Sequence, residues 1–105
     1  MPPNEPQIPP LKKKLFAMLK PVRDFMRDKD GDIKQELNGI VWRLEMNGTL
    51  EAPFGEKIAG KNLFAIRVIQ AGNIRVFYVY GKNSNMIYGI HAYEKKTDDI
   101  PFSWN

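Results

Sequence analysis

The sequence predicts an α+β domain with two N-terminal helices packed on one face of a small antiparallel sheet. Two helical patterns lie in the first half of the chain, and three strand-like segments follow one another in the second half. Short turn-forming segments separate these strands, as in a meander of hairpins. The 105 residues suffice for one small domain, and a hydrophobic content of 43% suffices for a packed core.

The first half of the chain divides into an arm and three elements. Residues 1–10 form a proline-rich arm that we expect to be extended and mobile, and residues 11–105 form the domain. Residues 11–19 fit a strand or a helix, and this element stays open. Pro21 suits the first turn of a short helix over residues 21–28.

A longer helix is predicted over residues 33–48, with Asp32 as its N-cap and Gln35 in the capping-box position. The pair Asn47-Gly48 is typical of a helix C-terminus. Gly39 inside this helix either costs about 1 kcal/mol against alanine or permits a close contact. One apolar stripe runs along the helix, formed by Ile33, Leu37, Ile40 and Leu44.

Residues 49–61 are irregular, and the predicted strands lie within residues 62–69, 73–80 and 85–95. Because strand side chains alternate between faces, each strand sorts into two sets. One set is almost wholly apolar and should face the helices: Phe64, Ile66, Val68, Ile74, Val76, Tyr78, Tyr80, Met86, Tyr88, Ile90 and Ala92. The other set holds every cation within the strands: Leu63, Ala65, Arg67, Ile69, Arg75, Phe77, Val79, Ile87, Gly89, His91, Tyr93 and Lys95.

The loop lengths predict which of these residues are neighbours. If the connection GKNSN is a loop centred on its third residue, Arg75 lies opposite His91 and Phe77 lies opposite Gly89. The preceding hairpin would set Arg67 opposite Phe77. Directly opposed residues have Cβ atoms about 4.5–5.5 Å apart, and a slip of one residue would break the arrangement.

Each polar residue of this face also has a structural interpretation. A single histidine in a strand is more often a hydrogen-bonded structural residue than a catalyst. Arg67 and Arg75 would serve equally as solvated cations or as partners of Glu94 or Asp98. Lysines at a strand end commonly protect an edge from aggregation, as Lys95 and Lys96 would. Their gathering on one face, opposite an apolar one, favours a polyanion-binding or catalytic surface.

Composition excludes several classes of protein. The absence of cysteine excludes a disulfide framework, a thiolate zinc site and a cysteine nucleophile, and it suits a reducing cytoplasm. No apolar run approaches the roughly 18 residues that span a membrane, and the N-terminus lacks the apolar region of a signal peptide. No carboxylate cluster has the spacing of metal ligands, so we expect no metal and no cofactor. The net charge of +4 weakly favours an anionic partner.

The segments GKNLFAIRV, GNIRVFYVY and MIYGIHAYEKKTDDIP resemble the RelE/HigB superfamily of toxins from type II toxin–antitoxin modules, especially its phage-derived, HigB-like branch. The resemblance runs from about residue 21 to residue 101. Ile74 stands where the branch has tyrosine, and Ala92-Tyr93 stands where it has Gly-Phe. The family's C-terminal helix is expected to be absent, because the chain ends shortly after Pro101.

The resemblance implies a cytoplasmic, ribosome-dependent endoribonuclease that cleaves mRNA without a metal and is neutralised by a cognate antitoxin, often of the helix-turn-helix type. The ribose 2′-hydroxyl would attack the adjacent phosphate. The catalytic set expected for this chemistry is Arg67, Arg75, His91 and Lys95, and the RNA-binding set is Lys57, Lys61, Tyr93 and Lys96. Two alternatives stay open: a non-catalytic toxin of the gyrase-poison type on the same fold, and a degenerate phage-derived domain that retains only antitoxin binding.

Overall fold

The computed structural model describes residues 11–96 of the chain. In chain order the elements are β1 (Leu15–Met18), α1 (Lys20–Met26), α2 (Gly31–Asn47), β2 (Gly55–Ala59), β3 (Leu63–Val68), β4 (Ile74–Tyr80) and β5 (Met86–Glu94). The proline-rich arm, Asp98 and the region of the expected missing C-terminal helix lie outside the described residues.

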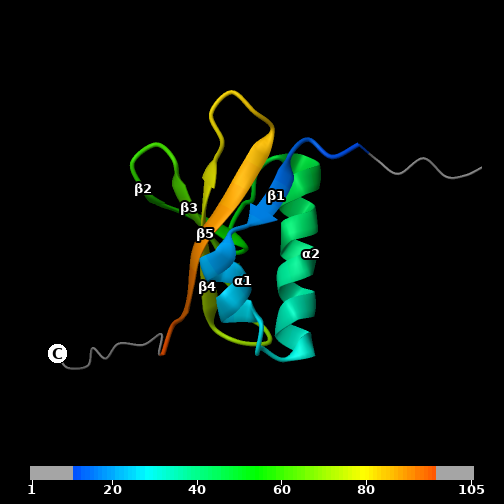
Figure 1. Cartoon of the computed structure of the whole chain (residues 1–105), viewed down its shortest axis with the longest axis vertical. Helices are drawn as coiled ribbons and strands as arrows, with labels where there is room; N and C mark the ends of the chain where they lie inside the picture. Colours follow the sequence, from blue (N-terminus) through cyan, green and yellow to red (C-terminus); the bar gives the residue numbers. More distant parts are fainter. Residues whose placement is uncertain (1–10, 97–105) are drawn as a thin grey trace, which may run out of the picture.

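The strands form one five-stranded sheet in the order β1-β5-β4-β3-β2. β1 runs parallel to β5, and the other neighbours are antiparallel. Both helices lie on one side of this sheet (Figure 1). The α+β class and the placement of the helices are confirmed, but the sheet is mixed and has two strands beyond the predicted meander.

The two additional strands form at the edges of the sheet, where local sequence signals are weak. β1 settles the open segment 11–19 as a strand, held on its free side by Glu45 of α2, whose carboxylate accepts the N–H of Phe16 at 2.8 Å. β2 lies in the segment that was predicted to be irregular, and it forms by pairing with β3. An edge strand is stabilised by its partner, so its own sequence need not show strong alternation.

The helices follow the sequence closely, but α1 ends at Met26, two residues before its predicted end, and α2 begins two residues before its predicted start. Pro21 lies in the first turn of α1, as predicted. α2 begins at Gly31 with Asp30 as its N-cap, so Asp32 lies inside the first turn and the predicted capping box with Gln35 is wrong. Gly48 ends α2 with a φ of 82°, in the left-handed region that favours glycine.

The hydrophobic core lies between the helices and the sheet. Leu37, Ile40 and Leu44 of α2 are buried, which confirms the predicted stripe. They belong to one cluster with residues of α1 and the central strands, including Val22, Ile66, Val76, Tyr78 and Ile87. The other face of the sheet, here called the outer face, carries no helix of the described part of the chain.

Both predicted registers are wrong by two residues. Arg67 pairs with Arg75 rather than with Phe77, and Arg75 pairs with Tyr93 rather than with His91. Glu36 of α2 accepts hydrogen bonds from the main-chain N–H groups of residues 69, 70 and 71. These bonds hold the β3–β4 connection so that it is centred one residue before Gly72, which is the predicted centre. A side chain from another element thus sets the turn.

The second register is displaced by the β4–β5 loop and by a β-bulge. Tyr78 pairs with Gly89, whereas Phe77 pairs with His91, so Ile90 is an extra residue. A bulge reverses the alternation on one side of itself. Residues 87 and 89 therefore face the helices, and the predicted faces of Met86, Ile87, Tyr88, Gly89 and Ile90 do not hold. Beyond the bulge the predicted alternation returns, and His91 and Tyr93 lie on the outer face.

Candidate functional site

Two arginines and a glutamate lie together on the outer face, contributed by three adjacent strands. Arg67 of β3 and Arg75 of β4 are directly paired across the sheet. Glu56 of β2 lies beside them, with its Oε1 3.4 Å from Arg75 Nε and 3.7 Å from Arg67 Nε. Like charges that face each other across a sheet repel, so the carboxylate between them stabilises the arrangement. We call these three residues the arginine–glutamate cluster.

The two arginines differ in their access to solvent. Arg75 is 6% exposed, and its Nη1 donates to Asn73 Oδ1 at 3.2 Å. Arg67 is half-buried, and its Nη1 donates to the carbonyl oxygen of Pro53 at 3.4 Å. Its buried Nε has no hydrogen-bond partner among residues 11–96, because the Glu56 oxygen is too distant. One guanidinium donor of the cluster is therefore unsatisfied within the described residues and shielded from solvent.

Three aromatic rings adjoin the cluster on the same face. Phe77 of β4 pairs with His91 of β5, and the centroids of their rings are 6.0 Å apart. The centroid of the Phe77 ring is also 5.6 Å from that of Tyr93. The His91 and Tyr93 rings are stacked at 6.5 Å. Both His91 and Tyr93 are exposed, and Tyr93 pairs with Arg75. An exposed aromatic surface thus borders a pair of guanidinium groups.

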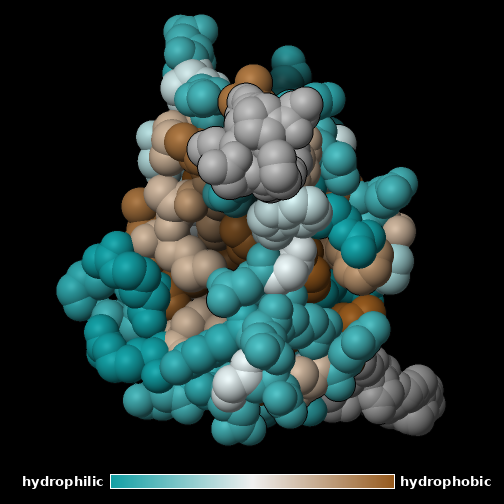
Figure 2. Space-filling view, turned by 90° about the vertical axis from the view of Figure 1, so that its right-hand side faces the viewer, coloured by the Kyte–Doolittle hydropathy of each residue, from teal (hydrophilic) through white to brown (hydrophobic). Residues whose placement is uncertain are grey.

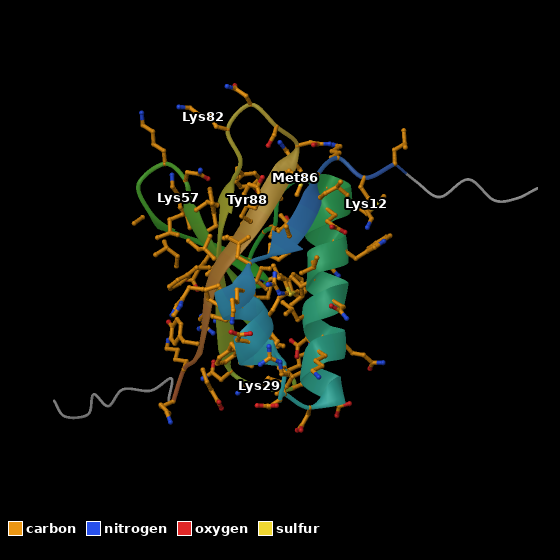
Figure 3. The ribbon with its side chains drawn as sticks, viewed as in Figure 1. Lys12, Lys29, Lys57, Lys82, Met86 and Tyr88 are labelled. Carbon is orange, nitrogen blue, oxygen red and sulfur yellow. The ribbon has the colours of Figure 1, made fainter. Side chains whose placement is uncertain are left out.

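The lysines of the predicted site are more dispersed. Lys57 pairs with Phe64, a residue of the helix side, so its register places it on the face opposite Glu56. Figure 3 shows it at the β2 end of the sheet. Lys61 is exposed in the turn between β2 and β3, and Lys95 and Lys96 follow the end of β5. The main-chain N–H of Lys95 donates to the Asn73 carbonyl oxygen at 2.7 Å, which ties this end to the loop beside Arg75.

Of the predicted site residues, the structure thus brings together Arg67, Arg75, His91 and Tyr93. It adds Glu56, which the sequence analysis missed because β2 was not predicted. The sequence carries no direct signal for Glu56, because neither β2 nor the pairing of Arg67 with Arg75 was predicted. Within residues 11–96, no group of three or more histidine or acidic side chains is placed to hold a metal ion.

The fold and this surface define a class of protein, an α+β domain with the arrangement of RelE-like toxins. A family model described as "Phage derived protein Gp49-like (DUF891)" matches residues 24–103. The match covers more than half of the chain, so the chain belongs to this Gp49-like family, which is a family of RelE/HigB-like toxins. Such membership indicates an antitoxin as partner.

A search of curated proteins found no match. None of the helices in the described part of the chain has the length and apolar character needed to cross a membrane.

Proposed function

We propose that the protein is a ribosome-dependent endoribonuclease toxin that cleaves messenger RNA. The observation that carries the proposal is the arginine–glutamate cluster beside exposed His91 and Tyr93 on a sheet face that no described helix covers. An open face of this kind is accessible to a strand of RNA threaded through a larger assembly. The Gp49-like family supplies the toxin class.

The reaction requires one phosphate to be bound while its charge grows. The 2′-oxygen gives up its proton and forms a bond to phosphorus, and the bond from phosphorus to the 5′-oxygen breaks. The products are a 2′,3′-cyclic phosphate and a 5′-hydroxyl, which takes up a proton. Arg67 and Arg75 would stabilise the transition state, since a planar guanidinium matches two phosphate oxygens. Arg67 reaches solvent and would contact the phosphate first. Arg75, which is almost buried beside it, would add a second positive charge to the site.

Two side chains are candidates for the proton transfers. Histidine is the residue best suited to exchange protons near neutral pH, and His91 is exposed at the rim of the cluster. Glu56, whose Oε1 lies 3.4 Å from Arg75 Nε and 3.7 Å from Arg67 Nε, would accept the proton of the 2′-hydroxyl. Tyr93 offers a ring on which a base stacks, and Lys57, Lys61, Lys95 and Lys96 would bind flanking phosphates.

The test is translation of a reporter messenger in vitro with the purified protein, followed by primer extension to map cleavage. We expect cleavage that depends on ribosomes. Arg67→Ala and His91→Ala should each slow it by about 10²–10³-fold, because each removes a group that acts in the transition state. Arg75→Ala should slow cleavage to the same extent. Because Arg75 is nearly buried, the thermal unfolding of this variant must also be measured, to show that it is folded.

Lys82→Ala is the matched control, since Lys82 lies in the β4–β5 connection away from the cluster (Figure 3). An intact messenger with the wild-type protein, or equal cleavage by the wild type and by His91→Ala and Arg67→Ala, would contradict the proposal.

One observation favours a second candidate, the antitoxin-binding domain without catalysis. Glu56 already occupies the position between the arginines, and Arg75 is almost inaccessible. A phosphate must therefore displace Glu56 or share the cluster with it. If the protein has no RNA-cleaving activity and its expression causes no growth defect, while it still binds the antitoxin, this second candidate replaces the first.

A further inference from the structure

A cavity lies between α1 and α2, on the side of the molecule away from the outer face of the sheet. Its volume is about 280 Å³. Apolar side chains of Met18, Met26 and Leu37 form its floor, and they belong to the hydrophobic core or pack against it. The rim is cationic, formed by Arg23, Arg27 and Lys34. We call this feature the α1–α2 groove.

The charge of the rim is only partly neutralised. Arg27 pairs with Asp24 at 2.6 Å, and Lys20 pairs with the same carboxylate at 2.7 Å. The hydrogen bonds from Lys20 and Arg27 lower the pKa of Asp24, although desolvation opposes the shift. Asp24 therefore carries a negative charge that offsets part of the positive charge of the rim. In contrast, Arg23 donates to the Met18 carbonyl oxygen and Lys34 to that of Arg27. These bonds position two cations without neutralising them.

Beyond the groove, the face of α2 that carries Lys34 and Asn38 leads to an exposed tryptophan. Lys34, Asn38 and Trp42 are spaced four residues apart, so they share one face of the helix. Trp42 is 54% exposed, an unusual exposure for so large an apolar ring. The stretch from Lys34 to Trp42 covers about 12 Å of helix axis, or roughly two turns. Figure 2, which views the right-hand side of Figure 1, shows apolar surface between hydrophilic side chains.

We propose that the α1–α2 groove binds an amphipathic helix of the antitoxin, with apolar side chains on the groove floor and against Trp42 and with acidic side chains on the rim. An apolar floor with an exposed tryptophan further along the same helix suits a helix that presents side chains at positions i, i+3, i+4 and i+7. Glutamate or aspartate at the flanks would pair with Arg23 and Lys34, the two cations of the rim that have no carboxylate partner within residues 11–96. The proposal takes the identity of the partner from the toxin family and does not depend on RNA cleavage.

The position of the groove has a consequence for the toxin. The two helices lie between the partner and the sheet, so the bound segment would leave the arginine–glutamate cluster uncovered (Figure 1). The groove therefore anchors the antitoxin, and a separate part of the antitoxin would be needed to obstruct the outer face.

A synthetic, fluorescein-labelled amphipathic peptide with leucine at the i, i+3, i+4 and i+7 positions and glutamate at the flanks is the probe. Fluorescence anisotropy should show saturable binding to the full chain. Arg23→Glu with Lys34→Glu should weaken binding about tenfold or more, because two exposed ion pairs are replaced by repulsion. Trp42→Ala should weaken it as well. A second peptide with lysine in place of glutamate should bind this double variant better than it binds the wild type.

Lys34→Glu alone is compared with Lys82→Glu, which makes the same charge change at a hairpin remote from the groove (Figure 3). Thermal unfolding of each variant confirms that it is folded. The proposal is overturned if the wild type shows no saturable binding, if both lysine variants weaken binding equally, or if an RNA oligonucleotide displaces the peptide from the wild type but not from the Lys34→Glu variant. None of these measurements includes a ribosome or messenger, so a failure of the proposed nuclease function leaves them intact.

Discussion

Glu56 determines what the outer face of the sheet can bind. Its carboxylate lies within 4 Å of two arginines that would otherwise repel each other. The same contact makes the carboxylate a competitor for any incoming phosphate. In the proposed function, a single residue on an edge strand would therefore both hold the arginines in the free protein and limit the access of phosphate to them.

Tyr78 is the other residue whose surroundings change its chemistry. It is 1% exposed and its ring packs against Phe16, Phe64 and Tyr80. Burial, aided by the neighbouring Tyr80, raises the pKa of Tyr78 above the ordinary value for tyrosine. The hydroxyl therefore stays protonated in the folded protein at pH values where a free tyrosine ionises.

This shift predicts a loss of stability in alkali. Above about pH 10 the unfolded chain releases the Tyr78 proton while the folded chain keeps it. The unfolded state then binds fewer protons, so the free energy of unfolding falls as the pH rises, and it shows no such dependence on this group below that pH. Thermal unfolding between pH 9 and pH 11 should show a shallower decline for Tyr78→Phe than for the wild type.

Tyr93→Phe is the matched control for this measurement, because Tyr93 is 38% exposed. Its profile should follow that of the wild type. Parallel profiles for the wild type and Tyr78→Phe would refute the assignment.

At the scale of elements, the bulge in β5 determines which residues meet α1 and β1. Because Ile90 is the extra residue, Gly89 faces the helices, where a Cβ atom would lie 2.9 Å from the Phe16 ring and 3.6 Å from Val22. The main-chain carbonyl of Gly89 also accepts the N–H of Leu19 at 2.9 Å. The absence of a side chain thus permits β1 and the start of α1 to approach β5.

Two glycine substitutions should have opposite effects on the free energy of unfolding. Gly89→Ala should lower it by about 1–3 kcal/mol, because the methyl group collides with a packed ring. Gly39→Ala should raise it by about 0.5–1 kcal/mol, since nothing lies within 4 Å of the new Cβ and alanine is the better helix former. Urea denaturation of the two variants measures both values.

The sequence left open whether Gly39 permits a close contact or only lowers helix stability, and the empty space around its Cβ position decides between the two. This glycine does not serve a close contact, so it only lowers the stability of α2. If Gly39→Ala were destabilising, or if Gly89→Ala had no effect, the packing described around these two residues would be wrong.

At the scale of the whole molecule, one core supports two separate surfaces. The helix side carries the α1–α2 groove, and the outer face carries the arginine–glutamate cluster with its aromatic neighbours. Between them lies a single cluster of buried side chains to which both helices and the central strands contribute. A partner and an RNA would therefore bind to opposite sides of the same cooperative unit.

Leu44→Ala tests this cooperativity. Leu44 is fully buried in α2, and its truncation should lower the free energy of unfolding by about 2–5 kcal/mol. Because one core joins the helices to the sheet, unfolding in urea followed by far-ultraviolet circular dichroism and by aromatic fluorescence should give the same midpoint.

Leu15→Ala is the comparison, because Leu15 of β1 is 45% exposed. Its effect should stay within about 0.5 kcal/mol. Separate midpoints for the two probes would show that the helices and the sheet unfold independently.

The sequence by itself determined the class of the fold, the apolar stripe of α2 and its end at Gly48. It also placed Arg67, Arg75, His91 and Tyr93 on one face, because hydrophobic periodicity and turn chemistry are local properties of the chain. The two register errors left that outcome unchanged, since each amounts to two residues and an even shift preserves the alternation between faces.

Only the tertiary structure decided the edge strands, the pairing of Arg67 with Arg75 and the place of Glu56. β1 depends on Glu45 and β5, and β2 depends on β3, so neither strand has a strong signal of its own. The turn between β3 and β4 depends on Glu36, a residue of a distant helix. The candidate site depends on the registers between neighbouring strands, and the α1–α2 groove depends on how two consecutive helices lie on the sheet, and no local pattern encodes either.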